Sequence, residues 1–152
     1  MFVELDFRQK AALEKLADQL LGKTYKFGAE VKMTCLPKDI VEIDCSELVE
    51  YLYYQIKIKI PDGSQNQYLV SKEIADFEMD TGDLVFKRDI KLLRVNHVGM
   101  ILKTTPLLYN VVEASGWHGK VIMRPFSMFK KEKGKSEYCG VRRLIKDKVS
   151  LV

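Results

Sequence analysis

The chain has 152 residues, of which 47% are apolar and 30% are charged, and its net charge is +4. This length predicts a single domain over residues 1–152, and the balanced charge excludes a protein dominated by an acidic or basic disordered tail. Because the lysines are scattered and no base-stacking motif accompanies them, we expect no nucleic-acid partner.

The sequence contains neither a membrane span nor a signal peptide that we can identify. No segment approaches the roughly 20 consecutive apolar residues that a spanning helix needs. Glu4, Asp6 and Arg8 interrupt the region where a signal peptide has its apolar stretch. We therefore expect a chain that is cytoplasmic as synthesised and that reaches an external substrate with a phage particle or by another export route.

Helical patterns dominate the first part of the chain. Asp6 and Gln9 have the spacing of a capping box, and leucines at helical spacing follow them. These signals predict a helix over residues 7–21, with Gly22 as its C-terminal stop. After a loop, apolar residues recur with a period near 3.6, and a second helix is expected to begin within residues 44–46.

From Thr81 onward the pattern changes to that of β-strands. Short apolar runs are separated by Gly, Pro and charged residues; they cover residues 84–86, 98–102, 109–112, 121–123 and 141–144. No helical pattern lies between these runs, which favours an antiparallel sheet over βαβ units. The stretch 130–135 is interpreted as a solvated loop. The predicted fold class is α+β, with N-terminal helices packed on a central antiparallel sheet of about five strands.

Cys45 lies between Asp44 and Ser46 at the predicted start of the second helix. The helix dipole and the free backbone N–H groups there favour a thiolate, and the same N–H groups can bind an oxyanion. Taken alone, the position favours a buried structural cysteine, because free cysteine is among the most buried residue types. The other cysteines, Cys35 and Cys139, form no close pair with it, which argues against a disulfide scaffold or a zinc ribbon.

His97 begins the run 98–102 and is one of only two histidines. A cysteine nucleophile needs such a base, and the base needs an acceptor that orients it. Glu113, the only charged residue of the segment 111–114, is the candidate acceptor; the alternative is an outward-facing strand residue. Cys45, His97 and His118 are too dispersed to predict a zinc site, so we expect no metal and no cofactor.

Several segments resemble, in the same order, the motifs of the NlpC-type family of papain-like cell-wall peptidases. Asp44-Cys45-Ser46-Glu47-Leu48-Val49 is similar to the Asp-Cys-Ser-Gly-Leu-Val nucleophile motif, and Asn96-His97-Val98-Gly99-Met100 is similar to the His-Val-Gly-Ile-Tyr base motif. Further similarities lie at Tyr25-Lys26-Phe27-Gly28-Ala29 and over residues 61–67, 81–86 and 112–115. Together the motifs cover residues 23–126.

The resemblance implies a papain-like fold in which a helix carrying Cys45 packs on a sheet carrying His97 and Glu113. It also implies hydrolysis of an amide bond in the stem peptide of bacterial peptidoglycan, typically between D-glutamate and the diamino acid. Stem peptides are therefore the implied partner. Tyr25 would line the site near the nucleophile, and we group Asp44, Ser46 and Glu47 with it as candidate substrate-binding residues.

Three departures from the family pattern are visible. Glu47 stands where the family has glycine, and Glu113 stands where histidine is more common. The hairpin between His97 and Glu113 is also longer than usual. We expect the Glu47 carboxylate to lie near the substrate cleft, where it either repels substrate carboxylates or selects a free amine; the alternative is a solvated residue on the helix surface.

Two other functions remain compatible with the sequence. Papain-like relatives include intracellular amidases and lipid acyltransferases, which share the fold and differ in substrate. A non-catalytic relative that binds wall peptide is the third possibility, although Cys45 and His97 are both intact.

Overall fold

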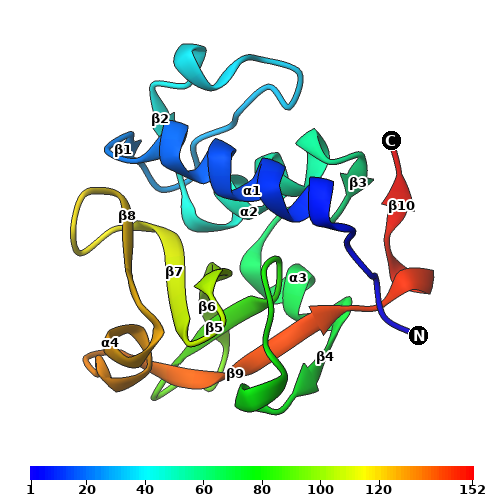
Figure 1. Cartoon of the computed structure of the whole chain (residues 1–152). Helices are drawn as coiled ribbons and strands as arrows, with labels where there is room; N and C mark the ends of the chain where they lie inside the picture. Colours follow the sequence, from blue (N-terminus) through cyan, green and yellow to red (C-terminus); the bar gives the residue numbers. More distant parts are fainter.

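The computed structural model describes all residues 1–152 as helices packed on a large curved sheet (Figure 1). The helices are α1 (Phe7–Leu20), α2 (Cys45–Gln55), α3 (Ser64–Leu69) and α4 (Phe126–Lys131). The strands are β1 (Thr24–Tyr25), β2 (Glu42–Ile43), β3 (Ile58–Lys59), β4 (Ser71–Ile74), β5 (Leu84–Asp89), β6 (Val95–Thr105), β7 (Leu108–Ser115), β8 (Lys120–Pro125), β9 (Ser136–Leu144) and β10 (Ser150–Leu151). No helix is both long enough and apolar enough to cross a membrane.

Eight strands form the main sheet, in the order β2-β1-β8-β7-β6-β5-β9-β4. The expected sheet of about five antiparallel strands is therefore wrong in number, and also in direction, since β1 and β2 pair in parallel. The five predicted runs are β5 to β9, which occupy the centre of this sheet. The missed strands are too short for alternation: β1 and β2 have two residues each, and β4 is buried only at its two ends.

Both predicted helix starts are confirmed. Asp6 and Gln9 form the capping box of α1, and Gly22 follows the helix with a positive φ of 86°. Asp44 is the N-cap of α2, since its Oδ1 accepts a hydrogen bond from the Glu47 N–H at 2.9 Å. The expected solvated loop at 130–135 is wrong for its first two residues, which belong to α4.

Apolar residues bury both faces of the sheet. The larger core lies between α1, α2 and the inner face, and it includes Leu48, Leu52, Phe86 and Met100. A smaller core lies on the opposite face, where Phe129 of α4 contacts the sheet. Because the central strands are buried on both faces, they appear in the sequence as continuous apolar runs.

Candidate active site

Cys45 is the first residue of α2 and is 9% exposed. The residue before it anchors this helix start: the Asp44 carboxylate accepts hydrogen bonds from the Gly28 N–H at 3.2 Å and from the Ser46 hydroxyl at 3.2 Å. The N–H groups in the first turn of a helix have no partner within the helix. The Cys45 thiol is thus placed at the positive end of the helix dipole.

His97 on β6 and Glu113 on β7 lie side by side, with His97 Nε2 at 2.9 Å from Glu113 Oε1. Gly99 makes this approach possible. A Cβ at position 99 would lie 2.6 Å from Val111 Cγ1 and 3.4 Å from Glu113 Cβ, so a larger residue would push β7 away. The glycine in the segment around His97 is therefore explained by close packing of two strands.

The imidazole of His97 is held in its charged form. Burial alone would lower the pKa of His97, but the neighbouring Cys45 side chain and the Glu113 carboxylate raise it to about 9. Since Nε2 is bonded to Glu113, Nδ1 is the nitrogen left for the thiol. The structure therefore brings Cys45, His97 and Glu113 together and places the imidazole between the Cys45 sulfur and a carboxylate.

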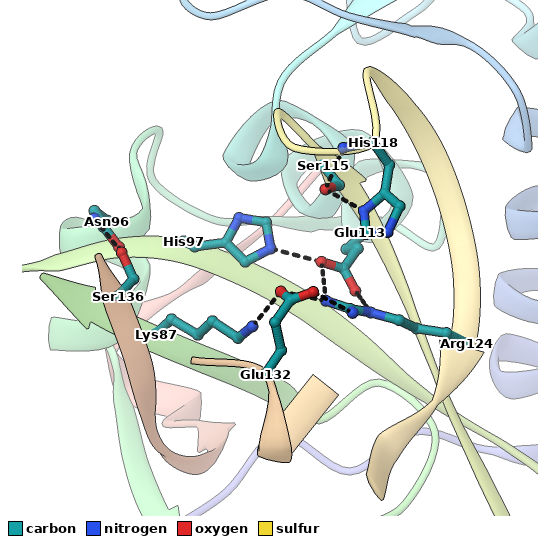
Figure 2. A network of polar contacts seen from close by, with 9 residues as sticks. All are labelled: Lys87, Asn96, His97, Glu113, Ser115, His118, Arg124, Glu132 and Ser136. Carbon is teal, nitrogen blue, oxygen red and sulfur yellow. Dashed lines mark hydrogen bonds and ion pairs between the residues drawn. The ribbon is translucent and has the colours of Figure 1, made fainter. Parts of the chain in front are cut away.

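Glu113 is also held from its other side by a residue that the sequence did not single out (Figure 2). Arg124 on β8 donates to Glu113 from Nε at 2.8 Å and from Nη2 at 3.2 Å. Burial would raise the pKa of Glu113, but His97 and Arg124 together lower it. The Glu113 side chain is only 1% exposed, and the two cations keep it ionised there.

The ion pairs continue beyond Arg124. Glu132 accepts from Arg124 Nη1 at 2.8 Å and Nη2 at 3.0 Å, and from Lys87 Nζ at 2.8 Å. We call the series His97–Glu113–Arg124–Glu132–Lys87 the charge chain, because its members alternate in sign (Figure 2). Each carboxylate in it lies between two cations, which fixes the position of both carboxylates.

Tyr25 lies near the thiol, as the resemblance implied. Burial raises the pKa of its hydroxyl, and the proximity of Cys45 and Asp44 raises it further. Its ring lies against Gly116, where an added Cβ would come within 3.2 Å of Cε1. Ser46 is 7% exposed, and its carbonyl accepts from Gln67 Nε2 at 3.0 Å, so its polar atoms are used within the protein.

Glu47 occupies a different environment from the one that we expected. It is 7% exposed, and its Oε2 accepts a hydrogen bond from the Val31 N–H at 2.9 Å. Its carboxylate faces the loop before α2, so it is neither a solvated helix residue nor part of the cavity beside His97. The reason is the length of that loop, which folds over α2 and covers this face of the helix.

An acidic cluster surrounds Glu47. Single carboxylate oxygens of Glu47, Glu50 and Asp62 lie within 4.8 Å of one another, and this is the one group in the chain with metal-ligand spacing. Burial raises the pKa of Glu47 to about 8; the Val31 N–H opposes this shift, and Glu50 adds to it. Glu47 therefore holds a proton at neutral pH.

Comparison with known proteins identifies a family and several similar proteins. A family model described as the NlpC/P60 family matches residues 22–140, a range that contains Cys45, His97 and Glu113. A curated Listeria grayi protein named "Probable endopeptidase p60" is 33% identical over 76 residues, which are 50% of this chain and 13% of the relative. This chain thus spans about one eighth of that relative's length.

Two solved structures from Mycobacterium tuberculosis share the fold. The peptidoglycan hydrolase RipB has a TM-score of 0.65 and 22% identity, over 90% of this chain and 64% of RipB. RipD, described as a non-catalytic NlpC/p60 domain protein adapted to a peptidoglycan-binding function, has a TM-score of 0.66 and 15% identity, over 90% of this chain and 97% of RipD. Catalytic and non-catalytic proteins therefore resemble this fold equally well.

Proposed function

This chain belongs to the NlpC/P60 family, and from that premise we propose that it is a cysteine peptidase that hydrolyses an amide bond in the stem peptide of bacterial peptidoglycan. Members of the family are generally peptidases. The observation that carries the proposal is the arrangement of Cys45, His97 and Glu113, in which a thiol at a helix start faces an imidazole bonded to an ionised carboxylate.

The chemistry follows from this geometry in two steps. With its proton transferred to His97, the Cys45 sulfur attacks the amide carbonyl carbon, and N–H groups at the start of α2 stabilise the oxyanion. His97 gives its proton to the leaving nitrogen, the C–N bond breaks, and an acyl thioester on Cys45 and a free amine result. His97 then takes a proton from water, whose oxygen attacks the thioester; a carboxylic acid leaves and Cys45 is regenerated.

Glu113 and Arg124 support these steps without touching the substrate. Glu113 fixes the orientation of the imidazole and stabilises its charged form, as an acceptor next to a catalytic histidine does. Arg124 keeps Glu113 ionised and fixes its rotamer through two hydrogen bonds. Both are positioning residues in the proposed reaction.

The proposed scissile bond lies between D-glutamate and the diamino acid, and the proposal rests here on the family resemblance. Tyr25 and Asp44 are proposed to line the acyl side of the site, because both lie close to Cys45. The endopeptidase name of the Listeria relative and the activity named for RipB support a wall-peptide substrate.

Mass analysis of muropeptides tests the proposal. We expect incubation with the protein to cleave the stem peptide at one bond, and Cys45→Ala to form no product. Cys35→Ser and Cys139→Ser are the matched controls and should cleave as the wild type does, because neither thiol lies beside His97.

Three outcomes would replace this proposal. Cleavage that persists in Cys45→Ala would remove the cysteine mechanism. Muropeptide binding without cleavage by the wild type would favour a binding function of the kind described for RipD. Turnover of acyl-lipid substrates tested in parallel, with muropeptides left intact, would favour an amidase or acyltransferase.

A further inference from the structure

A cavity of about 410 Å³ lies beside His97. It is lined by β5, the first residues of β6, the end of β7 with the β7–β8 turn, and the segment that connects α4 to β9. His97 and Glu113 belong to its wall, whereas Cys45 does not. The cavity therefore adjoins the imidazole on the side of Nε2, away from the thiol.

Two exposed lysines add positive charge to the wall of this cavity. The carboxylates in its wall, Glu113 and Glu132, are each bonded to two cations of the charge chain. Lys133 and Lys135 also line the cavity, and both are exposed. The only carboxylate within 4.0 Å of Lys133 is Glu137 at 3.8 Å, and Lys135 has none within that distance.

Trp117 adds an apolar surface to the same cavity. It is 89% exposed, although it lines the cavity wall with its neighbour Gly116. The turn that carries it is fixed, because Ser115 Oγ lies 2.8 Å from His118 Nδ1 and accepts from the His118 N–H at 3.2 Å. An aromatic side chain on this turn, beside two exposed ammonium groups, fits a ligand that combines an alkyl chain with an anionic group.

The position of the cavity indicates which half of the substrate reaches it. In the proposed reaction Nδ1 of His97 protonates the leaving nitrogen, so the leaving half of the substrate begins between the thiol and the imidazole and extends across the ring towards the cavity on its Nε2 side. Resting on the proposed function, we propose that this cavity binds the leaving half, and that Lys133 and Lys135 select an amine product that carries a carboxylate.

Binding of the product half tests the site without any turnover. Trp117 is the only tryptophan of the chain, so its fluorescence reports on this cavity alone. We expect a diamino-acid peptide with a free carboxylate to bind more tightly than its amide by about threefold to tenfold, the range for one or two solvent-exposed charge pairs. Added salt should reduce this difference.

The variant Lys133→Gln/Lys135→Gln should abolish the preference for the acid. Its matched control is Lys146→Gln/Lys148→Gln, which removes the same charge from exposed lysines that do not line the cavity. The control should keep the preference. Equal binding of acid and amide by the wild type, or a preference that survives in Lys133→Gln/Lys135→Gln, would overturn the inference.

Cleavage of two matched muropeptides separates this inference from the proposed function. The two substrates share the acyl half and differ only in a carboxylate or an amide on the leaving half. A higher kcat/KM for the acid that is lost in Lys133→Gln/Lys135→Gln supports the cavity assignment. Equal cleavage of both substrates overturns the cavity assignment and leaves the proposed peptidase function standing. Cleavage of neither substrate overturns the proposed peptidase function. In that case the fluorescence titration still decides whether the cavity selects a carboxylate.

Discussion

Two buried glutamates, Glu113 and Glu47, differ in charge: Glu113 is ionised, whereas Glu47 is protonated. Glu113 is 1% exposed and Glu47 is 7% exposed, so burial disfavours the ionised form of both. The pKa of Glu113 is nonetheless lowered, by His97 and Arg124, whereas burial raises the pKa of Glu47 to about 8 and the neighbouring Glu50 adds to this shift. Burial therefore decides the charge state of Glu47, whereas at Glu113 two neighbouring cations outweigh burial.

The two glutamates also differ in what they hold. Glu113 positions an imidazole, while Glu47 holds a loop by its backbone. Tyr51 and Gln55 follow Glu47 at helical spacing and do the same, since Tyr51 donates to the Cys35 carbonyl at 2.7 Å and Gln55 to the Met33 carbonyl at 2.6 Å. One helix therefore presents a thiol at its first residue and anchors the loop along one face.

The largest loss of activity is expected from substitution of His97, the member of the charge chain that lies next to the Cys45 thiol. His97→Ala removes both the proton donor for the leaving nitrogen and the base for water, so kcat should fall by about 10⁴-fold. Muropeptide cleavage measures this loss. A variant within tenfold of the wild type would mean that His97 takes no part in proton transfer.

The two glutamates themselves give the next test. Glu113→Ala should lower kcat by about 10²-fold, because the imidazole loses its acceptor. Glu113→Gln should retain more activity, because the amide oxygen still accepts from Nε2. Glu47→Gln makes the same chemical change in the other buried glutamate and should leave kcat within a few-fold of the wild type. Equal losses of kcat in Glu47→Gln and Glu113→Gln would contradict a positioning role that belongs to Glu113 and not to Glu47.

Arg124 variants change the environment of Glu113 alone. Arg124→Gln should lower kcat/KM by about tenfold, the equivalent of one charge-assisted hydrogen bond. Arg124→Lys keeps the charge, loses the paired N–H donors and should fall between Arg124→Gln and the wild type. If both variants are folded by circular dichroism and fully active, Arg124 does not position Glu113.

The smallest expected effect is on the free energy of unfolding, whose dependence on pH has opposite signs for Glu47 and Glu113. Glu47 keeps its proton up to about pH 8 when folded but releases it near its ordinary value of 4.5 when unfolded. Folding then takes up a proton between these values, and the wild type loses stability as the pH rises from 4.5 to 8. Glu47→Gln should therefore become the more stable protein over this range, by about 1–3 kcal/mol at pH 8.

For Glu113 the linkage is reversed. Its pKa is lowered on folding, so it contributes stability above its ordinary pKa and loses that contribution as the pH falls through the folded value. Glu113→Gln should be less stable than the wild type at neutral pH. Urea unfolding of both variants at pH 5 and pH 8 measures the two signs. A stability of Glu47→Gln that follows the wild type at both pH values would refute the protonation of Glu47 in the folded protein.

The sequence placed Cys45, His97 and Glu113 in one candidate site, because each lies in a short segment with a recognisable pattern, and their side chains lie together in the structure. It could not select Arg124 or Glu132. Arg124 reaches Glu113 only through the pairing of β7 with β8, and Glu132 lay in a stretch interpreted as solvated. A charged residue within a β-strand is a weak signal until its cross-strand partner is known.

Other differences have equally local causes. Strands β1 and β2 have two residues each, which is too short for an alternation of apolar and polar residues, so only the central five strands were predicted. Glu47 was placed near the cleft because its family counterpart is glycine, but the loop that contains Val31 covers it. Nothing in the loop's composition indicated that it would fold back onto α2.

The charge state of His97 is the most direct test of the account. His97 and His118 are the only histidines, so two imidazole signals are expected by NMR, and His97→Ala assigns them. The account predicts that His97 titrates with a pKa of about 9, that Glu113→Gln lowers this pKa, and that Glu47→Gln leaves it unchanged. A His97 pKa at or below 6.5 that Glu113→Gln does not alter would contradict it.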